Sequence, residues 1–232
     1  MEKGEEAAGR GLVKLWHVPQ ARSFRVLWFL HEAGIAHEVV YLDFGGKSLR
    51  DPAFLAISPA GRVPAVEIDG QTMFESGAIL EYLSETRAQG LWRAPGHAER
   101  RSWLECLHYA ETIGQHMAQL TQQHIVLRED WMRSPTVMKL EAMRLARVLA
   151  AVGAAADRNG WLLASGFSAV DVAIGYGVHM ARHFIRIEDV PGLAAYHARL
   201  TARPGFQAAA AADGPVLIYT RDFYEAPDDS PR

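Results

Sequence analysis

The sequence contains very little cysteine, because Cys106 is the only one among its 232 residues. A single cysteine excludes an intramolecular disulfide and any Cys-x-x-Cys pair, whether redox-active or metal-binding. We expect Cys106 to behave as a small apolar residue. The lack of a disulfide framework indicates a reducing compartment, and we predict a cytoplasmic location.

Long apolar runs and a strong charge of one sign are also missing. The longest apolar run, 148–156, is too short and too rich in alanine to cross a bilayer. The first 11 residues are acidic and lack the apolar core of a secretory signal. The net charge of -3 argues against nucleic acid or an anionic membrane as the main partner. We therefore expect neither kind of partner.

What the sequence does contain is a dense run of structural signals after residue 60. Residues 63–68 are apolar and rich in β-branched side chains, and Asp69-Gly70 is a strong signal for a tight hairpin turn. Residues 72–74 return as the partner strand, and apolar residues at helical spacing follow. These signals predict a strand, a turn, a second strand and a helix in immediate succession.

The predicted helix begins at Glu75-Ser76, and its first turn is suited to binding an anion. The first N–H groups of a helix lack partners inside the helix, and they form the positive end of its dipole. Ser76 and these amides would bind a carboxylate, while Glu75 would pair with a neighbouring ammonium group. One end of an amino acid fits this corner. The ordinary alternative is that Ser76 only caps the helix.

The order Val63-Pro64, hairpin, Glu75-Ser76, helix resembles the glutathione-binding half of the glutathione S-transferase superfamily. In that family, the residue before a cis-proline pairs its backbone with the cysteinyl part of glutathione. A Glu/Gln-Ser pair holds the γ-glutamyl end. The resemblance implies that Val63, a cis Pro64, Glu75 and Ser76 bind glutathione, and that Arg62 meets its glycyl carboxylate. Exposed arginines more commonly contact only water.

The residues before this stretch predict the rest of a small α/β domain at 12–87. Strand patterns cover 12–17 and 37–42, with a helix expected between them at 22–33 and a weak helix at 51–57. A strand–helix–strand unit of this length implies a parallel pair with a right-handed crossover. The resulting β-α-β-α-β-β-α order is the thioredoxin-like arrangement, a mixed sheet between helices.

Beyond a linker at 88–97 that contains Gly and Pro, the pattern is helical. Capping signals and apolar periodicity predict an all-helical bundle at 98–212, with tails at 1–11 and 213–232. The expected helices are 99–127, 134–158 and three that open at Ser168, Pro191 and Pro204.

Two segments extend the resemblance into the helical half. Gly166-Phe-Ser-Ala-Val-Asp171 is similar to the capping segment of the family's C-terminal domain, where it begins a buried helix. Leu107-His-Tyr-Ala-Glu111 and the stretch 22–28 resemble a fungal and bacterial branch of the family. The resemblance covers roughly residues 12–212. It implies a glutathione S-transferase-like fold, α/β followed by all-α, and a two-fold homodimer.

The chemistry of that family requires the glutathione thiol to lose its proton near neutral pH. The pKa of a free cysteine thiol is about 8.5, and it falls beside a helix N-terminus, a donor or a cation. Many members place a Ser or Tyr hydroxyl after the first strand, but here the corresponding residue is Ala21. Ser23, Arg22 and backbone amides are the candidate replacements. Local capping by Ser23 and a surface ion pair of Arg22 are the simpler roles, and we predict weaker thiolate activation than in serine-bearing relatives.

Other constellations are less specific. Tyr109, Ile113 and His116 share one side of the long helix and either line an electrophile pocket or pack against other helices. His179 and His183 are four residues apart and share a helix face, but no third ligand is evident. We therefore expect no metal.

These observations predict a glutathione transferase that catalyses thiolate attack on a small apolar electrophile, with glutathione as co-substrate and a role in detoxification. Two alternatives remain open. One is a non-catalytic glutathione- or ligand-binding protein of the same fold, which the loss of the hydroxyl at Ala21 makes credible. The other is a different glutathione-dependent reaction, such as peroxide reduction or isomerisation.

Overall fold

The computed structural model describes residues 11–226, which fold into two compact units. One unit combines residues up to 88 with residues 204–217, and the other combines 89–203 with the residues from 218 onward. The chain therefore passes from one unit to the other three times. Most of the predicted tail at 1–11 and the last residues of the tail at 213–232 lie outside the described residues.

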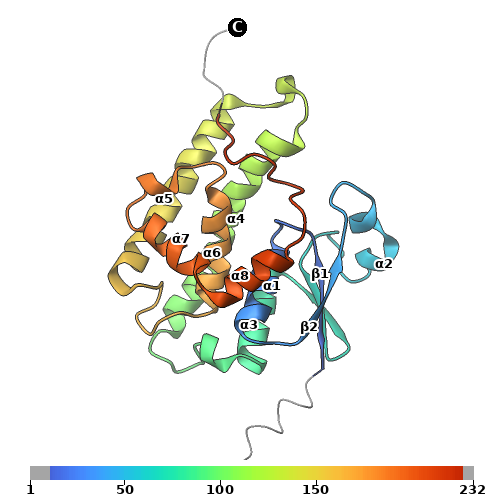
Figure 1. Cartoon of the computed structure of the whole chain (residues 1–232), viewed down its shortest axis with the longest axis vertical. Coiled ribbons are helices and arrows are strands. Elements are labelled where there is room, and N and C mark those ends of the chain that lie inside the picture. The colour runs from blue at the N-terminus through green and yellow to red at the C-terminus, as the bar shows by residue number, and fades with distance from the viewer. Residues whose placement is uncertain (1–10, 227–232) are drawn as a thin grey trace, which may run out of the picture. The chain divides into compact units, whose positions relative to one another are not determined.

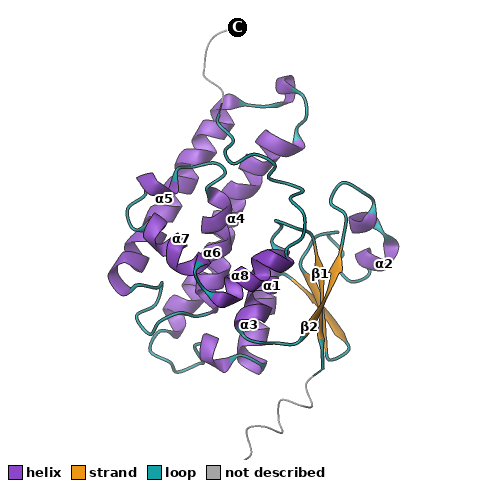
Figure 2. Ribbon diagram, in the orientation of Figure 1, coloured by secondary structure: helices purple, strands orange, loops and turns teal. Residues whose placement is uncertain are grey.

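The first unit is organised around a four-stranded mixed sheet (Figure 2). Its strands are β1 (Val13–His17), β2 (His37–Tyr41), β3 (Ala65–Ile68) and β4 (Gln71–Phe74), in the order β2-β1-β3-β4. The pair β1–β2 is parallel, whereas β1–β3 and β3–β4 are antiparallel. The predicted thioredoxin-like sheet is confirmed, including the parallel pair and the hairpin at Asp69-Gly70.

Helices α1 (Ser23–Glu32), α2 (Pro52–Leu55) and α3 (Ser76–Thr86) complete the part of this unit that the sequence predicts. All residues of α1 from Ser23 to Leu30 are buried, because β1, α3 and the later helix α8 (Pro204–Ala212) all pack against α1. A helix buried on all sides tolerates few polar residues. Those that α1 does contain therefore need partners.

The place of α8 differs from the predicted domain division, which assigned residues up to 212 to the helical bundle. The ring of Phe206 meets Trp28 and Phe24 of α1 edge-on, at centroid distances of 5.0 and 5.6 Å. Figure 1 labels α8 beside α1. Such aromatic contacts bury large apolar areas, and they place residues 204–217 in the first unit although α1 ends at Glu32 and α8 begins only at Pro204.

The second unit is helical, with α4 (Arg100–Thr121), α5 (Pro135–Asn159), α6 (Ala169–Ala181) and α7 (Leu193–Thr201) as its main elements. Two ends differ from prediction. The regular helix α4 stops at Thr121 and continues as a π-helical turn. The helix expected to open at Pro191 begins at Leu193 instead, because Gly192 in a left-handed conformation (φ 77°) forms its N-cap.

Local capping signals set both ends of α5 and the start of α6. The Ser134 hydroxyl accepts from the N–H of Val137 at 3.3 Å, and Gly160 ends α5 with φ 78°. The predicted capping box of Ser168 and Asp171 is present. A close approach fixes the packing of α5, since a Cβ on Gly153 would collide with the carbonyl of Pro191.

The predicted linker and part of the predicted tail are packed segments of the helical unit. Arg93 is buried and donates to Ser165 at 2.8 Å. Tyr219 hydrogen-bonds Thr121 at 2.9 Å and stacks on His183 at a centroid distance of 4.9 Å. Within residues 11–226, no helix is both long enough and apolar enough to span a bilayer.

Candidate functional site

The loop before β3 contains Val63 and Pro64, whose backbone is expected to pair with the cysteinyl part of glutathione. The Val63–Pro64 peptide bond is cis, as predicted. Ser58 is buried; its hydroxyl donates to the carbonyl of Arg62 at 2.8 Å and accepts from the N–H of the same residue at 3.3 Å. Ser58 therefore fixes the backbone at Arg62, while the Arg62 side chain is exposed to solvent.

Glu75 occupies an unusual backbone conformation at the corner between β4 and α3. Its dihedral angles are φ 73° and ψ 110°, and its side chain makes no capping hydrogen bond to the helix. A non-glycine residue in so sparsely populated a region costs about 1–3 kcal/mol, and such residues cluster at functional sites. The exposed Glu75 carboxylate is thereby presented at the N-terminus of α3 rather than used to cap it.

Ser76 is the first residue of α3, and its side chain is only 4% exposed. Its hydroxyl oxygen accepts a hydrogen bond from Nη1 of Arg25 at 3.1 Å. Because a hydroxyl has one proton and two acceptor sites, this bond leaves the Ser76 proton available for a further acceptor. Ser76 therefore can donate to a carboxylate.

Arg25 is a component of this corner that sequence reasoning did not assign to the site. It lies in the first turn of α1 and is only 1% exposed. Its guanidinium places positive charge directly behind Ser76. The only sequence signal was a lone arginine within the apolar run 24–30. That signal does not say which neighbour the arginine meets.

Ser23 follows the loop between β1 and α1, where the thiol would lie. Its hydrogen bonds differ from those of Ser76. Ser23 is 0% exposed; its hydroxyl accepts from the N–H of Val18 and donates to the carbonyl of Val18, both at 3.2 Å. The single proton of this hydroxyl is therefore already used. Ser23 closes the loop, the local role that the sequence also allowed, and a catalytic role stays a prediction that requires this bond to break.

The other residues of this loop contribute backbone groups and one cation. The N–H of Ala21 donates to the carbonyl of Val18 at 3.1 Å. Arg22 is half-buried at the N-cap of α1, so its charge lies at the start of the helix. In the first turn of α1, the N–H of Phe24 donates to the carbonyl of Ala21 at 2.9 Å, and the N–H of Arg25 donates to the carbonyl of Arg22 at 3.1 Å. These amides are therefore already used within the loop, and the charge of Arg22 is what the loop offers in place of a side-chain hydroxyl.

The three residues predicted for an electrophile pocket make contacts between helices of the second unit. The Tyr109 hydroxyl donates to the carbonyl of Val148 at 3.0 Å, and burial raises its pKa. Ile113 lies where Gly177 lacks a side chain, 2.7 Å from an ideal Cβ. Both contacts are of the packing kind that the sequence left open, and the pocket role stays a prediction.

Nδ1 of His116, the third of these residues, lies 2.7 Å from the Glu141 carboxylate, and Arg144 meets the same carboxylate at 2.6 Å. Burial opposes ionisation of Glu141, but the hydrogen bonds from His116 and Arg144 outweigh it and lower the pKa. The His116 imidazole of α4 is thus held against α5.

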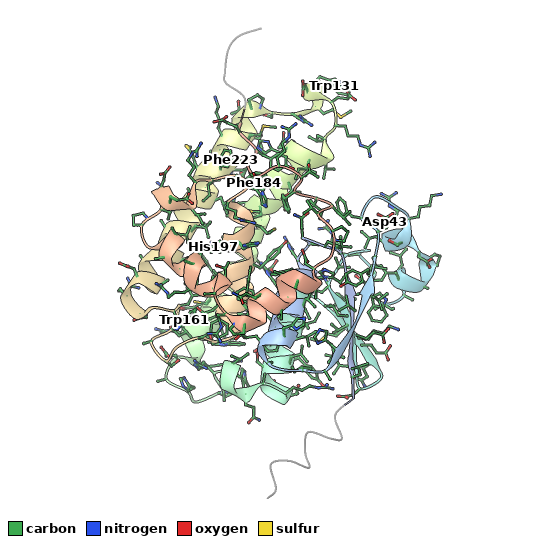
Figure 3. All side chains as sticks on the ribbon, in the orientation of Figure 1. Asp43, Trp131, Trp161, Phe184, His197 and Phe223 are labelled. Atoms are coloured by element: carbon green, nitrogen blue, oxygen red, sulfur yellow. The ribbon has the colours of Figure 1, made fainter. Side chains whose placement is uncertain are left out.

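His179 and His183 do not share a helix face as predicted, because α6 ends at Ala181 and His183 lies in the turn that follows. Nδ1 of His179 lies 3.0 Å from Nε2 of His197 on α7, a residue labelled in Figure 3. Nδ1 of His183 lies 2.9 Å from the carbonyl of Arg221. Among residues 11–226, no three His, Cys, Asp or Glu side chains gather in a way that suits a metal ion.

Comparisons with known proteins converge on one group. The family described as "Glutathione S-transferase, N-terminal domain" matches residues 12–85. The chain is 26% identical to the disulfide-bond oxidoreductase YfcG of Escherichia coli (strain K12), over 83% of this chain and 92% of that protein. It is 30% identical to glutathione S-transferase F10 of Arabidopsis thaliana, over 66% of this chain and 73% of that protein.

A solved structure supports the same fold. The crystal structure of the glutathione transferase URE2P6 from Phanerochaete chrysosporium, in complex with oxidized glutathione, aligns with a TM-score of 0.80 at 22% identity. The alignment covers 89% of this chain and 98% of that chain. The matched N-terminal family region includes the corner formed by Glu75 and Ser76.

Proposed function

Because the chain belongs to the glutathione S-transferase superfamily, we propose that it binds glutathione and catalyses attack of the glutathione thiolate on a small apolar electrophile. The observation that carries this proposal is the corner at the start of α3. There, Ser76 has a free hydroxyl proton backed by the buried charge of Arg25, and Glu75 presents a carboxylate beside it.

The corner suits the γ-glutamyl end of glutathione because that end is a zwitterion. Its α-carboxylate accepts from the Ser76 hydroxyl and the first-turn amides of α3, in the positive field of the helix end and of Arg25. Its α-ammonium pairs with the exposed carboxylate of Glu75. The proposed backbone pairing with Val63 then orients the cysteinyl residue, and Arg62 meets the glycyl carboxylate.

Bound in this way, the thiol lies toward the first turn of α1. The group that stabilises its thiolate is the charge of Arg22, since the side chain of Ala21 offers no donor and the proton of the Ser23 hydroxyl is used by Val18. The first-turn N–H groups of α1 donate to loop carbonyls. We propose that this chain activates the thiol more weakly than relatives that carry a serine there. The attacking thiolate forms a carbon–sulfur bond and the leaving group departs with the electron pair.

Similarity to a disulfide-bond oxidoreductase along nearly its whole length favours thiol–disulfide exchange as a second candidate. The protein's own thiol is poorly suited to this reaction, because burial raises the pKa of Cys106 to about 11. Glutathione would therefore supply the thiols. One glutathione thiolate attacks the substrate disulfide and expels a thiolate, and a second glutathione resolves the mixed disulfide to yield oxidised glutathione.

The binding proposal is tested by the substitution Ser76→Ala. Loss of a hydrogen bond to a charged group is worth about 1.5–3 kcal/mol, so the Kd for glutathione measured by calorimetry should rise at least about tenfold. Ser84→Ala is a matched control, because Ser84 is a buried serine on the same helix that bonds only the carbonyl of Leu80. Equal affinities of the two variants, or no binding by the wild type, would refute the proposal.

The reaction is tested with a panel of substrates that share glutathione. Turnover of an aryl halide supports the transferase. Turnover of a small disulfide with no halide conversion supports exchange, and hydroperoxide or isomerase activity supports the remaining alternative. Binding without turnover of any of these substrates would identify a non-catalytic glutathione-binding protein.

We also propose an apolar electrophile pocket that includes Tyr109, Ile113 and His116. The proposed role is detoxification in a reducing, cytoplasmic compartment. The protein is further proposed to form a two-fold homodimer. The homodimer rests on membership of the superfamily and on the isologous pairing typical of soluble oligomers. Light scattering on the purified chain measures it directly.

A further inference from the structure

The residues that follow α8 carry an exposed apolar surface that no fold contact explains. Val216 is 62% exposed and Leu217 is 43% exposed. Single apolar residues on a protein surface are ordinary. These two are consecutive, and they belong to residues 213–217, here called the strap, which the fold holds against the β1–α1 loop.

Two sets of hydrogen bonds tie the strap to Gln20 of that loop. The backbone N–H of Gln20 donates to both carboxylate oxygens of Asp213, at 3.1 and 3.3 Å. The side-chain oxygen of Gln20 accepts from the N–H of Leu217 at 3.1 Å. Both ends of the strap are therefore attached to a single loop residue, and the backbone of Leu217 lies directly beside the loop.

The strand ends beneath the loop hold the strap as well. Nε2 of His17, which is 0% exposed, lies 3.1 Å from the Asp213 carboxylate and 3.1 Å from the Asp213 carbonyl. The Tyr41 hydroxyl donates to the carbonyl of Ala212, the residue before the strap. All of these residues belong to the first unit. The strap is therefore a fixed part of the unit that carries the candidate glutathione site.

We propose that Val216 and Leu217 bind the apolar group that the reaction attaches to glutathione sulfur. This inference rests on the proposed function, in which the thiol lies toward the start of α1. The β1–α1 loop leads into that helix, so an electrophile in reach of the sulfur also reaches the strap. The apolar group leaves water against Val216 and Leu217, and it stays there as the S-substituent of the product.

The strap suits this role better than the pocket residues predicted on the long helix. The Tyr109 hydroxyl donates to Val148, and Ile113 packs where Gly177 lacks a side chain, so both are used between helices. Val216 and Leu217 instead present their side chains to solvent. The strap thus adds an apolar surface in the first unit itself.

The strap is also prepared for contact with an apolar group. The N–H of Leu217 is already bonded to Gln20, and Pro215 has no N–H. An apolar group can therefore cover this backbone without leaving either residue an unsatisfied donor. Because the strap is held in place before the ligand arrives, little ordering is required on binding.

The first test measures the Kd of a ligand series by calorimetry. The series is glutathione and its S-methyl, S-butyl and S-hexyl derivatives. A fully buried methylene is worth about a fourfold gain in affinity. On this open surface we expect about twofold per methylene, so that S-hexylglutathione binds the wild type about 30-fold more tightly than S-methylglutathione.

The variants are Leu217→Ser, Val216→Ser and the conservative Leu217→Met. Each serine should reduce the ratio of S-methyl to S-hexyl Kd by about three- to tenfold, whereas methionine should keep it within about twofold. The Kd for unsubstituted glutathione should change less than about twofold, because the α3 corner is untouched. Substitutions at such exposed positions leave the fold intact.

Leu12→Ser is the matched control, because Leu12 is a leucine of the same unit and is 56% exposed. It precedes β1, whereas the loop follows the other end of that strand. A strand of this length spans about 16 Å. Leu12→Ser should therefore leave the whole ligand series unchanged.

A kinetic comparison tests the same contact during the reaction. In the reactions of chlorodinitrobenzene and of iodoacetamide, the thiolate forms a carbon–sulfur bond and the halide leaves with the electron pair. Iodoacetamide offers almost no apolar surface, so it reports the thiolate alone. Leu217→Ser should lower kcat/KM for the aryl chloride relative to iodoacetamide by about three- to tenfold.

The results that overturn the inference are distinct from those that overturn the proposed function. If the wild type binds glutathione but its affinity does not rise with the S-alkyl chain, the strap role is refuted and glutathione binding stands. Equal ligand series for Leu217→Ser and Leu12→Ser also refute it, as does an equal loss of affinity for glutathione and S-hexylglutathione. Failure of the wild type to bind glutathione removes both.

Discussion

The two units of this protein reach their structures by different routes. In the helical unit, helix ends are set by residues within a few positions of one another, such as Ser168 with Asp171 at the start of α6. In the first unit, the features of the candidate site depend on distant partners: Ser76 is 51 residues from Arg25, and Asp213 is 193 residues from Gln20. Secondary structure is therefore local information, whereas this site depends on tertiary contacts.

The largest effect on stability is expected from removing the contact that holds α8 in the first unit. Phe206→Ala deletes a buried ring that packs on Trp28 and Phe24. Replacing a buried phenylalanine with alanine costs about 3–5 kcal/mol. We expect a loss of that size in the free energy of unfolding measured with urea.

Phe44→Ala is the matched control, because Phe44 belongs to the same unit and is exposed. That substitution should change stability by no more than about 0.5 kcal/mol. Equal effects of the two substitutions would mean that α8 does not contribute to the core of the first unit.

A second substitution tests whether a local motif has a comparable effect in the helical unit. The Asp171 carboxylate accepts from the N–H of Leu162, the N–H of Ser168 and the Tyr196 hydroxyl, at 3.1, 2.9 and 2.9 Å. Asp171→Asn turns one acceptor into a donor that faces another donor. Leaving a buried donor unsatisfied costs about 1–3 kcal/mol, and we expect a loss of about 2–3 kcal/mol in urea unfolding.

Asp157→Asn on the exposed face of α5 is the control for that measurement. It removes the same charge without burying a group, so it should leave stability nearly unchanged. If Asp171→Asn were no worse than this control, the capping box would not determine the stability of the helical unit.

The pH dependence of the free energy of unfolding tests a buried histidine of the helical unit, His179. Burial, reinforced by Arg182, His197 and His183, lowers the pKa of His179 from 6.5 to about 3. Between these values the unfolded chain binds the extra proton, so stability falls as the pH drops from about 6.5 toward 3. One such group contributes up to about 1.4 kcal/mol per pH unit in that window.

Asp171 opposes this slope, because burial raises its pKa from 3.8 to about 6. Between those values the folded state binds the extra proton, so this group favours folding at lower pH. The clean measurement is therefore the difference in slope between the wild type and His179→Gln. We expect the variant to lose about 1 kcal/mol less stability per pH unit on acidification; identical slopes would mean that His179 titrates normally.

The smallest expected effect comes from a half-buried local cap. Ser134→Ala removes the hydroxyl that accepts from Val137 and should cost about 1 kcal/mol, whereas Ser134→Gly should cost only a few tenths. Thr136→Ala, on the exposed first turn of the same helix, should be neutral or slightly stabilising because alanine favours helices. Thermal unfolding of the three variants is sufficient to rank them.

The sequence alone supported the element order, the parallel strand pair, the hairpin at Asp69-Gly70 and the capping box at Ser168, because each depends on neighbouring residues. It also supported the superfamily, since the Val-Pro and Glu-Ser signals lie close together in one short stretch. Periodicity was less reliable at helix ends: α4 leaves the regular α-helix at Thr121, and α7 starts after a left-handed glycine.

Only the tertiary structure decided how the site is supported. It places the buried charge of Arg25 behind Ser76, commits the Ser23 hydroxyl to Val18, and returns Asp213 to the loop at Gln20. No local pattern reports these contacts, because a side chain's hydrogen-bond partner depends on where the folded backbone brings it. Sequence thus determined the elements and predicted the kind of site, and tertiary packing determined which of its hydroxyl groups still has a proton to donate.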